Sequence, residues 1–575
     1  MELGRISAVI GASNSGKTEL LRDLLRLTVN LDLRKSEADT PNEAELPLIL
    51  RDLEFQSHLT PDELMRGLPG ISERPQESKV LSGLGPMLNG PKLLNVQPEV
   101  WSILQRPTLL ASTTQRSRLA ELLQLRVAYS DVMTRKESLQ ATAACSPSDT
   151  HANLLQALHF AAPEIHAELD ASYFEITRSL HIKLDDTKRV QLALRVAEQF
   201  PESSTDPCEA IREMEMIPGI EQQSEGHQAI VAIVLGMLLG QGRLHLLNDP
   251  AVFLDPLLAR RLGQWIARNA ERLNCQVIVA TDSEAFLAGL FSGNEDVSVI
   301  RTQRDRVSSR CDYFSTSDIA SLYKSPFFSE HELVGILFTG RAIVLQDATE
   351  ATFYKTIALR QDGEVTVSFV NAHGRQNISF MAKLLRDVGI PICVVADWSS
   401  LDSRNNLESL VKSVTGELPL QAWYSTRDKL EQQIGCHWSR ESLSIASREV
   451  EDFLDRMSGE NGLETPSRPN GALKSDESVL DWKMLCQVGI DAVNDDFRPW
   501  LEQLFDELQE VGIFIVPIGQ LQGWLDFGAD MSKPDWFFNA MSELEMSECP
   551  TNLELFVSRM IDYLITRQAA PSNPF

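Results

Sequence analysis

The chain has 575 residues, with 53 Lys and Arg against 81 Asp and Glu, which gives a formal net charge of −28. Its length predicts more than one domain with sizeable cores, since single domains usually contain about 100–200 residues. A hydrophobic fraction of 43% and a charged fraction of 23% exclude a chain that is disordered throughout. The excess of acid excludes a surface that coats nucleic acid broadly, so any DNA site has to be a local basic groove.

The cysteines and the N-terminal residues narrow the cellular setting. The eight cysteines are scattered singly, without a C-x-x-C pair, so neither a zinc site nor a disulfide framework is predicted. The first residues do not form a basic segment followed by a long apolar one, and no apolar stretch reaches the roughly 18 residues of a membrane span. We therefore expect a cytoplasmic protein with reduced thiols and no membrane association.

The N-terminal half alternates between predicted strands and helices. Residues 5–10 form a β-prone run, and leucines at helical spacing follow over 19–26 after a Gly-rich turn. A mostly helical insertion is expected over about 113–200, with helices at 118–124 and 151–162. The α/β pattern then resumes, with helices at 229–239 and 257–273 and strands at 244–247 and 276–280.

The C-terminal half begins a second α/β alternation after a border near residues 324–329. Three apolar runs are typical of buried parallel strands: 342–345, 392–396 and 511–517. Residues 457–478 are polar and rich in helix breakers, so we expect a surface loop or a disordered insertion there. We predict two α/β domains, 1–327 and 328–575.

Residues 11–18 read Gly-Ala-Ser-Asn-Ser-Gly-Lys-Thr and match the phosphate-loop pattern G-x-x-x-x-G-K-[ST] between a predicted strand and a predicted helix. In this motif backbone N–H groups turn inward around the phosphates, the Lys reaches the β and γ oxygens, and the Thr hydroxyl reaches Mg²⁺. The nucleotide-binding residues predicted here are Gly11, Ser13, Asn14, Ser15, Gly16, Lys17 and Thr18.

Four downstream segments follow in a fixed order, namely Gln223–Gln228, Leu244–Pro250, Phe253–Pro256 and Val277–Ser283. This order resembles the signature loop, Walker B strand, D-loop and switch strand of ABC-type ATPases. The resemblance implies an N-terminal ABC-type P-loop ATPase head that takes ATP and Mg²⁺. It also implies that ATP lies between two heads, contacted by Ser224, Gly226 and Gln228 of the second head, so a head-to-head homodimer is expected.

Substitutions at three positions separate the chain from a working ATPase of this kind. Asn248 replaces the Asp that holds Mg²⁺, Asp249 replaces the catalytic Glu, and Asp282 replaces the switch His. Asn248 brings no charge to the metal, and Asp249 is one methylene short for a base, where a misplacement of about 1 Å can cost on the order of 10²-fold in rate. We take Thr18, Asn248 and Asp249 as metal ligands and Asp249 and Asp282 as catalytic candidates, and expect ATP to act as a structural clamp with slow or absent hydrolysis.

Several C-terminal segments resemble a TOPRIM domain. Residues 342–354, AIVLQDATEATFY, are similar to its opening, and 390–401 to its D-x-D strand end. Residues 511–524 and Lys533 are similar to the GELE element and the Lys-containing tail of OLD-family (overcoming lysogenization defect) nucleases. An ABC head followed by TOPRIM is the layout of that family, which implies a role in bacterial anti-phage defence.

A TOPRIM nuclease holds divalent ions between several carboxylates. Four positions that the resemblance assigns to these carboxylates carry neutral side chains here: Gln346, Ser399, Gln520 and Gln522. Glu350 and Asp397 remain as metal ligands and catalytic candidates, with Lys533 as a third catalytic candidate. Because hard divalent ions prefer anionic oxygens, we expect a degenerate nuclease site.

The alternative function is an active, ATP-regulated and metal-dependent DNA endonuclease with relocated ligands. In it Asp347, Glu350, Asp397 and Asp402 would rebuild a one-metal site. A helix N-cap is the competing interpretation of Asp402, and His373 is interpreted as a hydrogen-bonding loop residue rather than a general base.

The expected partners are a second copy of the chain, in a dimer or higher oligomer, and a protein partner for an ATP-gated scaffold or sensor. Basic stretches at 22–34 and 301–310 are interpreted as solvated faces, so DNA stays an open partner that the overall charge does not support. A role in DNA repair or chromosome organisation is disfavoured, because the predicted insertion is too short for a long coiled-coil arm.

Overall fold

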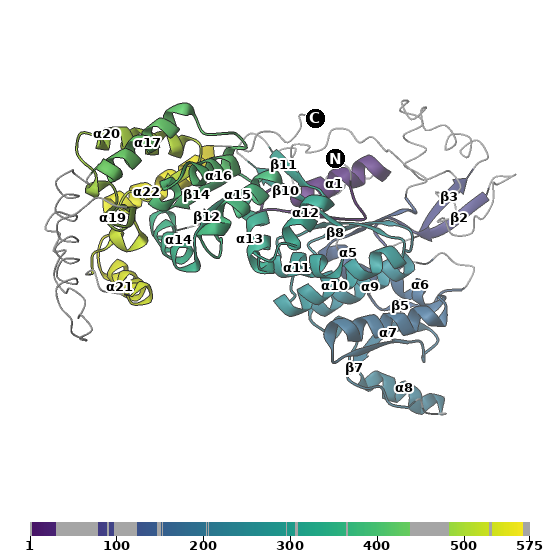
Figure 1. The fold of residues 1–575 in the computed structure, drawn as a ribbon. Coiled ribbons are helices and arrows are strands. Elements are labelled where there is room, and N and C mark those ends of the chain that lie inside the picture. Colours follow the sequence, from purple (N-terminus) through teal and green to yellow (C-terminus); the bar gives the residue numbers. More distant parts are fainter. Residues whose placement is uncertain are drawn as a thin grey trace, which may run out of the picture. The chain divides into compact units, whose positions relative to one another are not determined.

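The computed structural model describes residues 3–29, 79–88, 91–96, 124–146, 151, 153–202, 204, 206–294, 296–304, 309–363, 366–436, 482–527 and 532–566. The chain divides into two compact units, Met1–Phe338 and Thr339–Phe575. Both are mixed α/β units with parallel sheets, as the sequence predicts (Figure 1). The predicted loop at 457–478 and nearly all of the predicted helix at 118–124 lie outside the described residues.

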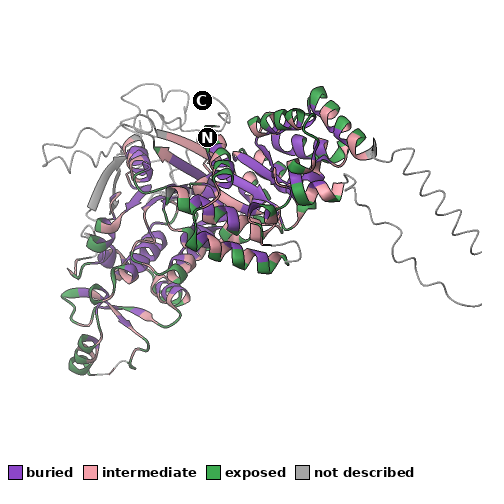
Figure 2. Cartoon of the chain, turned by 90° about the vertical axis from the view of Figure 1, so that its left-hand side faces the viewer, coloured by how far each residue is buried: buried purple, intermediate pink, exposed green. Residues whose placement is uncertain are grey.

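The main sheet of the N-terminal unit has six strands in the order β11-β10-β1-β9-β8-β4. These strands are β1 (Ile6–Ile10), β4 (Val127–Ser130), β8 (Leu244–Asn248), β9 (Gln276–Ala280), β10 (Val297–Arg304) and β11 (Ser309–Phe314). All neighbours pair in parallel except β10 and β11. Every residue of β1 is buried, as Figure 2 shows for the inner strands, because β1 is paired on both edges and covered on both faces.

Helix α1 (Lys17–Val29) covers one face of this sheet, and α10 (Pro256–Arg272) and α11 (Glu284–Gly293) lie on the other (Figure 1). Leu21 and Leu25 of α1 pack against Val9, Leu246 and Ile278 of the strands in one apolar core. Burial of these side chains anchors the first helix directly behind the turn that ends β1.

The predicted helical insertion contains strands as well as helices. Its described elements are α5 (Val132–Ser138), β5 (Thr142–Ala143), α6 (Leu154–His159), α7 (Pro163–Thr177), β6 (His181–Asp185) and β7 (Gln191–Ala197). The helical prediction for 113–200 is wrong at β4, which joins the main sheet, and at β6 and β7, which form an antiparallel hairpin. Burial alternates along β7 with a period of two residues, which is a strand pattern.

The other elements that the described part of this unit contains are β2 (Lys79–Leu84), β3 (Pro91–Val96), α8 (Pro207–Met216), η3 (Ile220–Gln222), α9 (Glu225–Leu239), α12 (Thr316–Tyr323) and α13 (Glu330–Thr339), whose last residue belongs to the second unit. Helix α9 begins at the predicted signature segment and is buried along nearly its whole length, and it packs against α5 and α7.

The C-terminal unit has a four-stranded parallel sheet in the order β13-β12-β14-β15. Its strands are β12 (Ala342–Leu345), β13 (Ser368–Asn371), β14 (Ile392–Ala396) and β15 (Ile513–Ile515). The first and third have the predicted bounds. The strand predicted at 511–517 shortens to 513–515, because Gly512 has a φ of +89° and Pro517 has no N–H for a ladder.

Within its described residues, this unit has the helices α14 (Ala348–Asp362), α15 (Ile378–Asp387), α16 (Arg404–Thr415), α17 (Gln421–Cys436), α19 (Trp482–Val488), α20 (Arg498–Glu510), α21 (Lys533–Met546) and α22 (Thr551–Thr566), with short 3₁₀ turns η4 (Arg375–Asn377), η5 (Trp398–Leu401), η6 (Gly489–Ala492) and η7 (Leu521–Trp524). An aromatic core joins α14 to α21. The rings of Phe353 and Trp536 lie 5.4 Å apart, and the Trp524 indole donates to the Tyr354 hydroxyl at 3.0 Å. This packing brings the first residues of α14 and α21 to the same region.

Helices α10 and α11 approach so closely that only glycine fits at their contact. A Cβ at Gly289 would lie 2.1 Å from the carbonyl oxygen of Arg260, which is backbone and cannot rotate away. We predict that Gly289→Ala destabilises the N-terminal unit by about 2 kcal/mol, which raises the equilibrium population of opened molecules roughly 30-fold. Hydrogen exchange of α10 and α11 measures this. Gly4→Ala is the control, because its nearest contact would be an ordinary 3.5 Å; equal exchange in both variants would contradict the close packing.

Candidate functional site

The turn after β1 has the backbone shape that a phosphate loop requires. Gly11 has a φ of +148°, Asn14 of +63° and Gly16 of +97°. A Cβ at Gly11 would lie 2.4 Å from the carbonyl oxygen of Thr302, so no other residue fits there without movement. The Lys17 ammonium donates to the carbonyl oxygens of Gly11 at 2.9 Å and Ala12 at 3.0 Å. The turn therefore closes around its own lysine.

Thr302 of β10 holds this turn from the neighbouring strand. Its hydroxyl donates to the carbonyl oxygen of Ile10 at 3.1 Å and lies 2.8 Å from the Ser15 hydroxyl. Both side chains are buried. Thr302 belongs to no motif, and no sequence signal pointed to it.

The predicted loop residues differ in their exposure. Gly11, Ser15, Gly16 and Lys17 are buried in the turn, whereas Ser13 and Asn14 are exposed at its crest. The turn joins a buried strand to the N-terminus of a 13-residue helix, whose unpaired N–H groups and dipole favour an anion. Positive φ values, a lysine and a helix N-terminus together make a phosphate cradle.

The ends of the neighbouring strands bring the downstream motifs to this edge. The Thr18 hydroxyl donates to Asn248 Oδ1 at 3.0 Å. The Asp249 N–H donates to the carbonyl oxygen of Ala280 at 2.8 Å, and the Thr281 N–H to that of Val9 at 2.9 Å. The structure thus gathers Thr18, Asn248 and Asp249 beside the loop.

A buried arginine that the sequence does not predict as a site residue is hydrogen-bonded to the end of β8. The Arg135 guanidinium of α5 donates to the carbonyl oxygens of Asn248 and Asp249, both at 3.0 Å. Burial lowers its pKa to about 10, and Asp131 and Asp249 oppose that change. Asp131, which caps α5 by accepting from the Thr134 N–H, fixes the helix that carries this arginine.

Asp249 carries the most constrained carboxylate of this edge. Its φ is +45°, and its Oδ1 is buried without a hydrogen-bond partner among the described residues. Burial raises its pKa, the nearby Asp282 raises it further, and Lys17 and Arg135 oppose the rise. The predicted catalytic pair Asp249 and Asp282 is therefore brought close enough to repel.

The predicted signature residues lie at the start of α9. Ser224 caps the helix by accepting from the His227 N–H at 3.4 Å, and Gln228 donates to the Gln223 carbonyl at 3.0 Å. A Cβ at Gly226 would lie 2.5 Å from the carbonyl oxygen of Phe253, so glycine allows the D-loop segment to pack there. These contacts are with residues of the same segment and the D-loop, not with the phosphate turn.

In the C-terminal unit, the carboxylates at the end of β12 have partners within the protein. Asp347 caps α14, with its Oδ1 accepting from the N–H groups of Thr349 and Glu350. The Lys533 ammonium lies 2.5 Å from Asp347 Oδ2 and 3.7 Å from Glu350 Oε1. The structure thus brings Glu350 and Lys533 together, and adds Asp347.

Glu350 is 14% exposed and also accepts from the Gln346 N–H at 3.1 Å. Burial raises its pKa to about 7; Lys533 lowers it, whereas the negative charges of Asp347 and Asp397 raise it. Glu350 is therefore a weak ligand for a divalent ion, because its pKa is near neutrality and the Lys533 ammonium already lies beside it.

Asp397 and Asp402 are engaged in local hydrogen bonds. Asp397 caps η5 by accepting from the Ser399 N–H and hydroxyl, with Arg375 4.0 Å away. Asp402 is not a helix N-cap, because Ser403 caps α16; its carboxylate instead accepts from Asn406 at 2.6 Å. His373 is hydrogen-bonded to Asn371, as expected for a loop residue.

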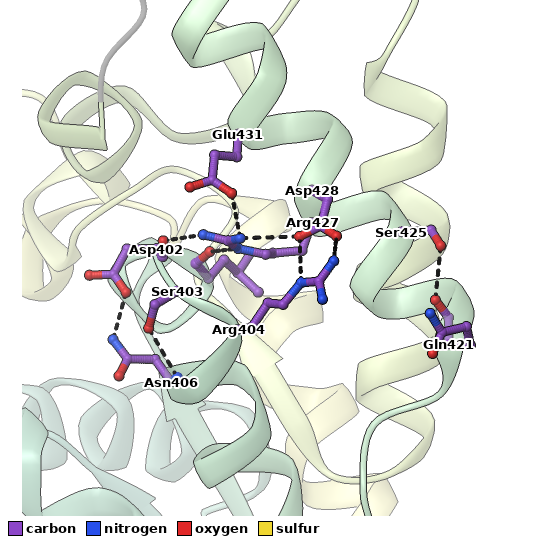
Figure 3. A network of polar contacts seen from close by, with 10 residues as sticks. Asp402, Ser403, Arg404, Asn406, Gln421, Ser425, Arg427, Asp428 and Glu431 are labelled. Carbon is purple, nitrogen blue, oxygen red and sulfur yellow. Dashed lines mark hydrogen bonds and ion pairs between the residues drawn. The ribbon is translucent and has the colours of Figure 1, made fainter.

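Figure 3 shows the polar network around Asp402, which joins α16 to α17. The buried Arg427 donates to the carbonyl oxygens of Leu401 and Asp402 and pairs with Asp428 and Glu431. Arg427 thus fixes the turn that follows β14, and Asp402 serves this turn as a structural residue.

Two further expectations concern metals and DNA. Within the described part of the chain, no group of three or more His, Cys, Asp or Glu is arranged to hold a metal ion. In the basic stretch 301–310, Arg301 is 4% exposed and pairs with Asp312, so its interpretation as a solvated face is wrong. Arg306 lies outside the described residues.

None of the helices in the described ranges is both long and apolar enough to cross a membrane.

Comparisons with known proteins give a partial structural likeness. No family model and no curated protein matches the chain. The SmcHead bound to the C-winged helix domain of ScpA is similar at 13% identity over 55% of this chain and 92% of that one, with a TM-score of 0.33. A Pyrococcus furiosus Smc head domain bound to the C-terminal domain of ScpA is similar at 11% identity over 56% and 94%, with a TM-score of 0.29. Both TM-scores are low, so these likenesses support no conclusion about function.

The ion pairs of Lys533 generate a prediction with a defined pH dependence. The pKa of Glu350 is raised in the folded protein, so the folded protein loses stability as pH rises through about 7 and the buried carboxyl ionises. The positive charge of Lys533 stabilises the ionised carboxylate and so makes this loss smaller. We predict that Lys533→Met costs about 1 kcal/mol at pH 8 and less at pH 5, where Glu350 is protonated. Thermal unfolding at both pH values tests this. Lys483→Met, at an exposed lysine of α19, is the control, and an equal loss at both pH values would contradict the assignment.

Proposed function

We propose that the protein is an ATP-binding, ABC-type head that forms a head-to-head homodimer and uses ATP as a clamp, with slow or absent hydrolysis. The closed turn of residues 11–18 around Lys17 is the observation that carries ATP binding. Its strand-loop-helix setting supports the same conclusion, because each part meets a requirement of phosphate recognition.

Slow hydrolysis is supported by the residues at the end of β8. Asn248 meets Thr18 through a neutral amide, and Asp249 has a shorter side chain than the Glu expected of a catalytic base. Asp282 adds a second negative charge near Asp249. Each feature weakens the activation of water more than the binding of nucleotide.

Dimerisation is supported by the surroundings of the signature segment. Ser224 is exposed, and three large apolar side chains of α5, the D-loop and α10 are also exposed: Met133 at 63%, Phe253 at 61% and Leu257 at 55%. Apolar groups of this size at a polar helix start favour burial against another surface. In the ABC arrangement, that surface is the phosphate loop of a second head.

For the C-terminal unit we propose a TOPRIM-like domain with an impaired nuclease site, in a cytoplasmic scaffold or sensor of bacterial anti-phage defence. The motif order of OLD-family nucleases supports the family assignment, and the neutral Gln346, Ser399, Gln520 and Gln522 support the loss of metal. Lys533 places an ammonium where carboxylates would otherwise attract an ion. A protein partner then binds the ATP-bound dimer.

ATP-dependent association tests the main proposal. We predict that ATP and Mg²⁺ double the mass measured by light scattering, and that Lys17→Ala removes this change because the phosphates lose their ammonium partner. Lys183→Ala, at an exposed lysine of β6, is the matched control and should dimerise normally. Nucleotide-independent dimerisation, or an unaffected Lys17→Ala variant, would contradict the clamp.

Plasmid nicking tests the endonuclease alternative. We expect supercoiled plasmid to stay intact with Mg²⁺ or Mn²⁺, with and without ATP, because the remaining carboxylates already have internal partners. Nicking that disappears on Asp397→Ala would show instead that relocated ligands form a working site.

A further inference from the structure

Asn248 stands where a charged metal ligand is expected, but it is a neutral residue that is hydrogen-bonded to Thr18. In phosphate-loop NTPases, Mg²⁺ is held by the loop Ser or Thr and by an Asp at the end of a neighbouring strand. Asn248 stands at such a strand end, but its Oδ1 accepts from the Thr18 hydroxyl at 3.0 Å. A carboxamide adds no negative charge for a hard cation. Asn248 therefore positions Thr18 and leaves the charge of the metal to another residue.

The backbone of the next residue, Asp249, is fixed from two sides. Its N–H donates to the Ala280 carbonyl at 2.8 Å, and its own carbonyl accepts from Arg135 at 3.0 Å. These anchors hold a φ of +45°, which costs a non-glycine residue on the order of 1 kcal/mol. The backbone at Asp249, and with it the Cα–Cβ bond, is thus fixed without using the carboxylate itself.

The carboxylate of Asp249 lacks a partner for one oxygen. Its Oδ1 is buried and accepts no hydrogen bond from the described residues. Such an unpaired buried acceptor costs about 1–3 kcal/mol, more when it is charged. The two nearest cationic groups direct hydrogen bonds to backbone carbonyls: Lys17 to Gly11 and Ala12, and Arg135 to the end of β8. The oxygen is left for a cation that enters with the phosphates.

We propose that Asp249, rather than Asn248, supplies the protein carboxylate to the Mg²⁺ that accompanies a nucleoside triphosphate in the loop of residues 11–18. The proposal rests on the ATP binding proposed above and assigns the metal within it. A carboxylate bonded to a divalent cation has little affinity for a proton, so it cannot also serve as general base. The end of β8 offers one carboxylate where ABC-type ATPases have two, so its use as a ligand leaves no base there to activate water.

Metal affinity, measured without turnover, separates a ligand from a base. Wild-type protein and variants are loaded with the non-hydrolysable analogue AMP-PNP, and Mn²⁺ binding is titrated by electron paramagnetic resonance. We expect the isosteric Asp249→Asn to weaken Mn²⁺ binding about tenfold or more, and Asn248→Ala to weaken it less than about threefold. The double variant Asn248→Asp with Asp249→Asn should recover most of the loss, because it returns a carboxylate to the strand end.

The outcomes are distinct. Removal of a general base leaves ground-state binding intact, so Mn²⁺ affinity that is unchanged or higher in Asp249→Asn would overturn this inference alone. A loss in Asp249→Asn that the double variant does not recover would also count against it, since misfolding would then explain the loss. If wild-type protein binds no AMP-PNP with or without Mn²⁺, the proposed function falls, and the inference falls with it.

Discussion

The parallel pairing of β1 with β9 on one side and β10 on the other is the constraint on which the nucleotide site depends. Ile6 lies opposite both Val277 and Val297, so the three strands end at the same edge of the sheet. The residues that follow β1 and β9 meet there by geometry alone. Thr302 then locks the turn so tightly that no side chain fits at Gly11. A shift of β1 against β10 would move the phosphate cradle as a whole.

The two units treat their remaining carboxylates differently. In the C-terminal unit, an internal ammonium, Lys533, lies between Asp347 and Glu350, and a cation is thus built into the fold. In the N-terminal unit, Asp249 has a buried oxygen that accepts no hydrogen bond from the described residues, although two cationic side chains lie nearby. The first pair of carboxylates already has a cation within the fold, whereas the second arrangement would gain stability from the cation that we propose binds there.

The parts of the account that were predictable from sequence are local in the chain. The strand, turn and helix of residues 5–29 form a contiguous motif, and the strands at 342–345 and 392–396 are short apolar runs with clear ends. Contacts across hundreds of residues have no such signal. Thr302 with Ser15 and Arg135 with Asn248 depend on strand order, which periodicity does not contain.

Two errors have specific physical causes. The helical prediction fails at the hairpin of β6 and β7, because burial along β7 alternates with the two-residue period of a strand. Asp402 was weighed as a helix cap, but the neighbouring Ser403 takes that place, since a serine hydroxyl reaches the same N–H groups. The sequence shows which residue types can cap a helix, but the backbone conformation determines which of two adjacent residues does so.

A single-turnover assay tests the clamp most directly, with protein in excess over radiolabelled ATP and phosphate release followed over time. The double variant Asn248→Asp with Asp249→Glu, which restores both acids at the end of β8, is the reference. We predict that the wild type retains uncleaved ATP and releases phosphate on the order of 10²-fold more slowly than this variant. Rapid release by the wild type that is abolished by Lys17→Ala would contradict the account.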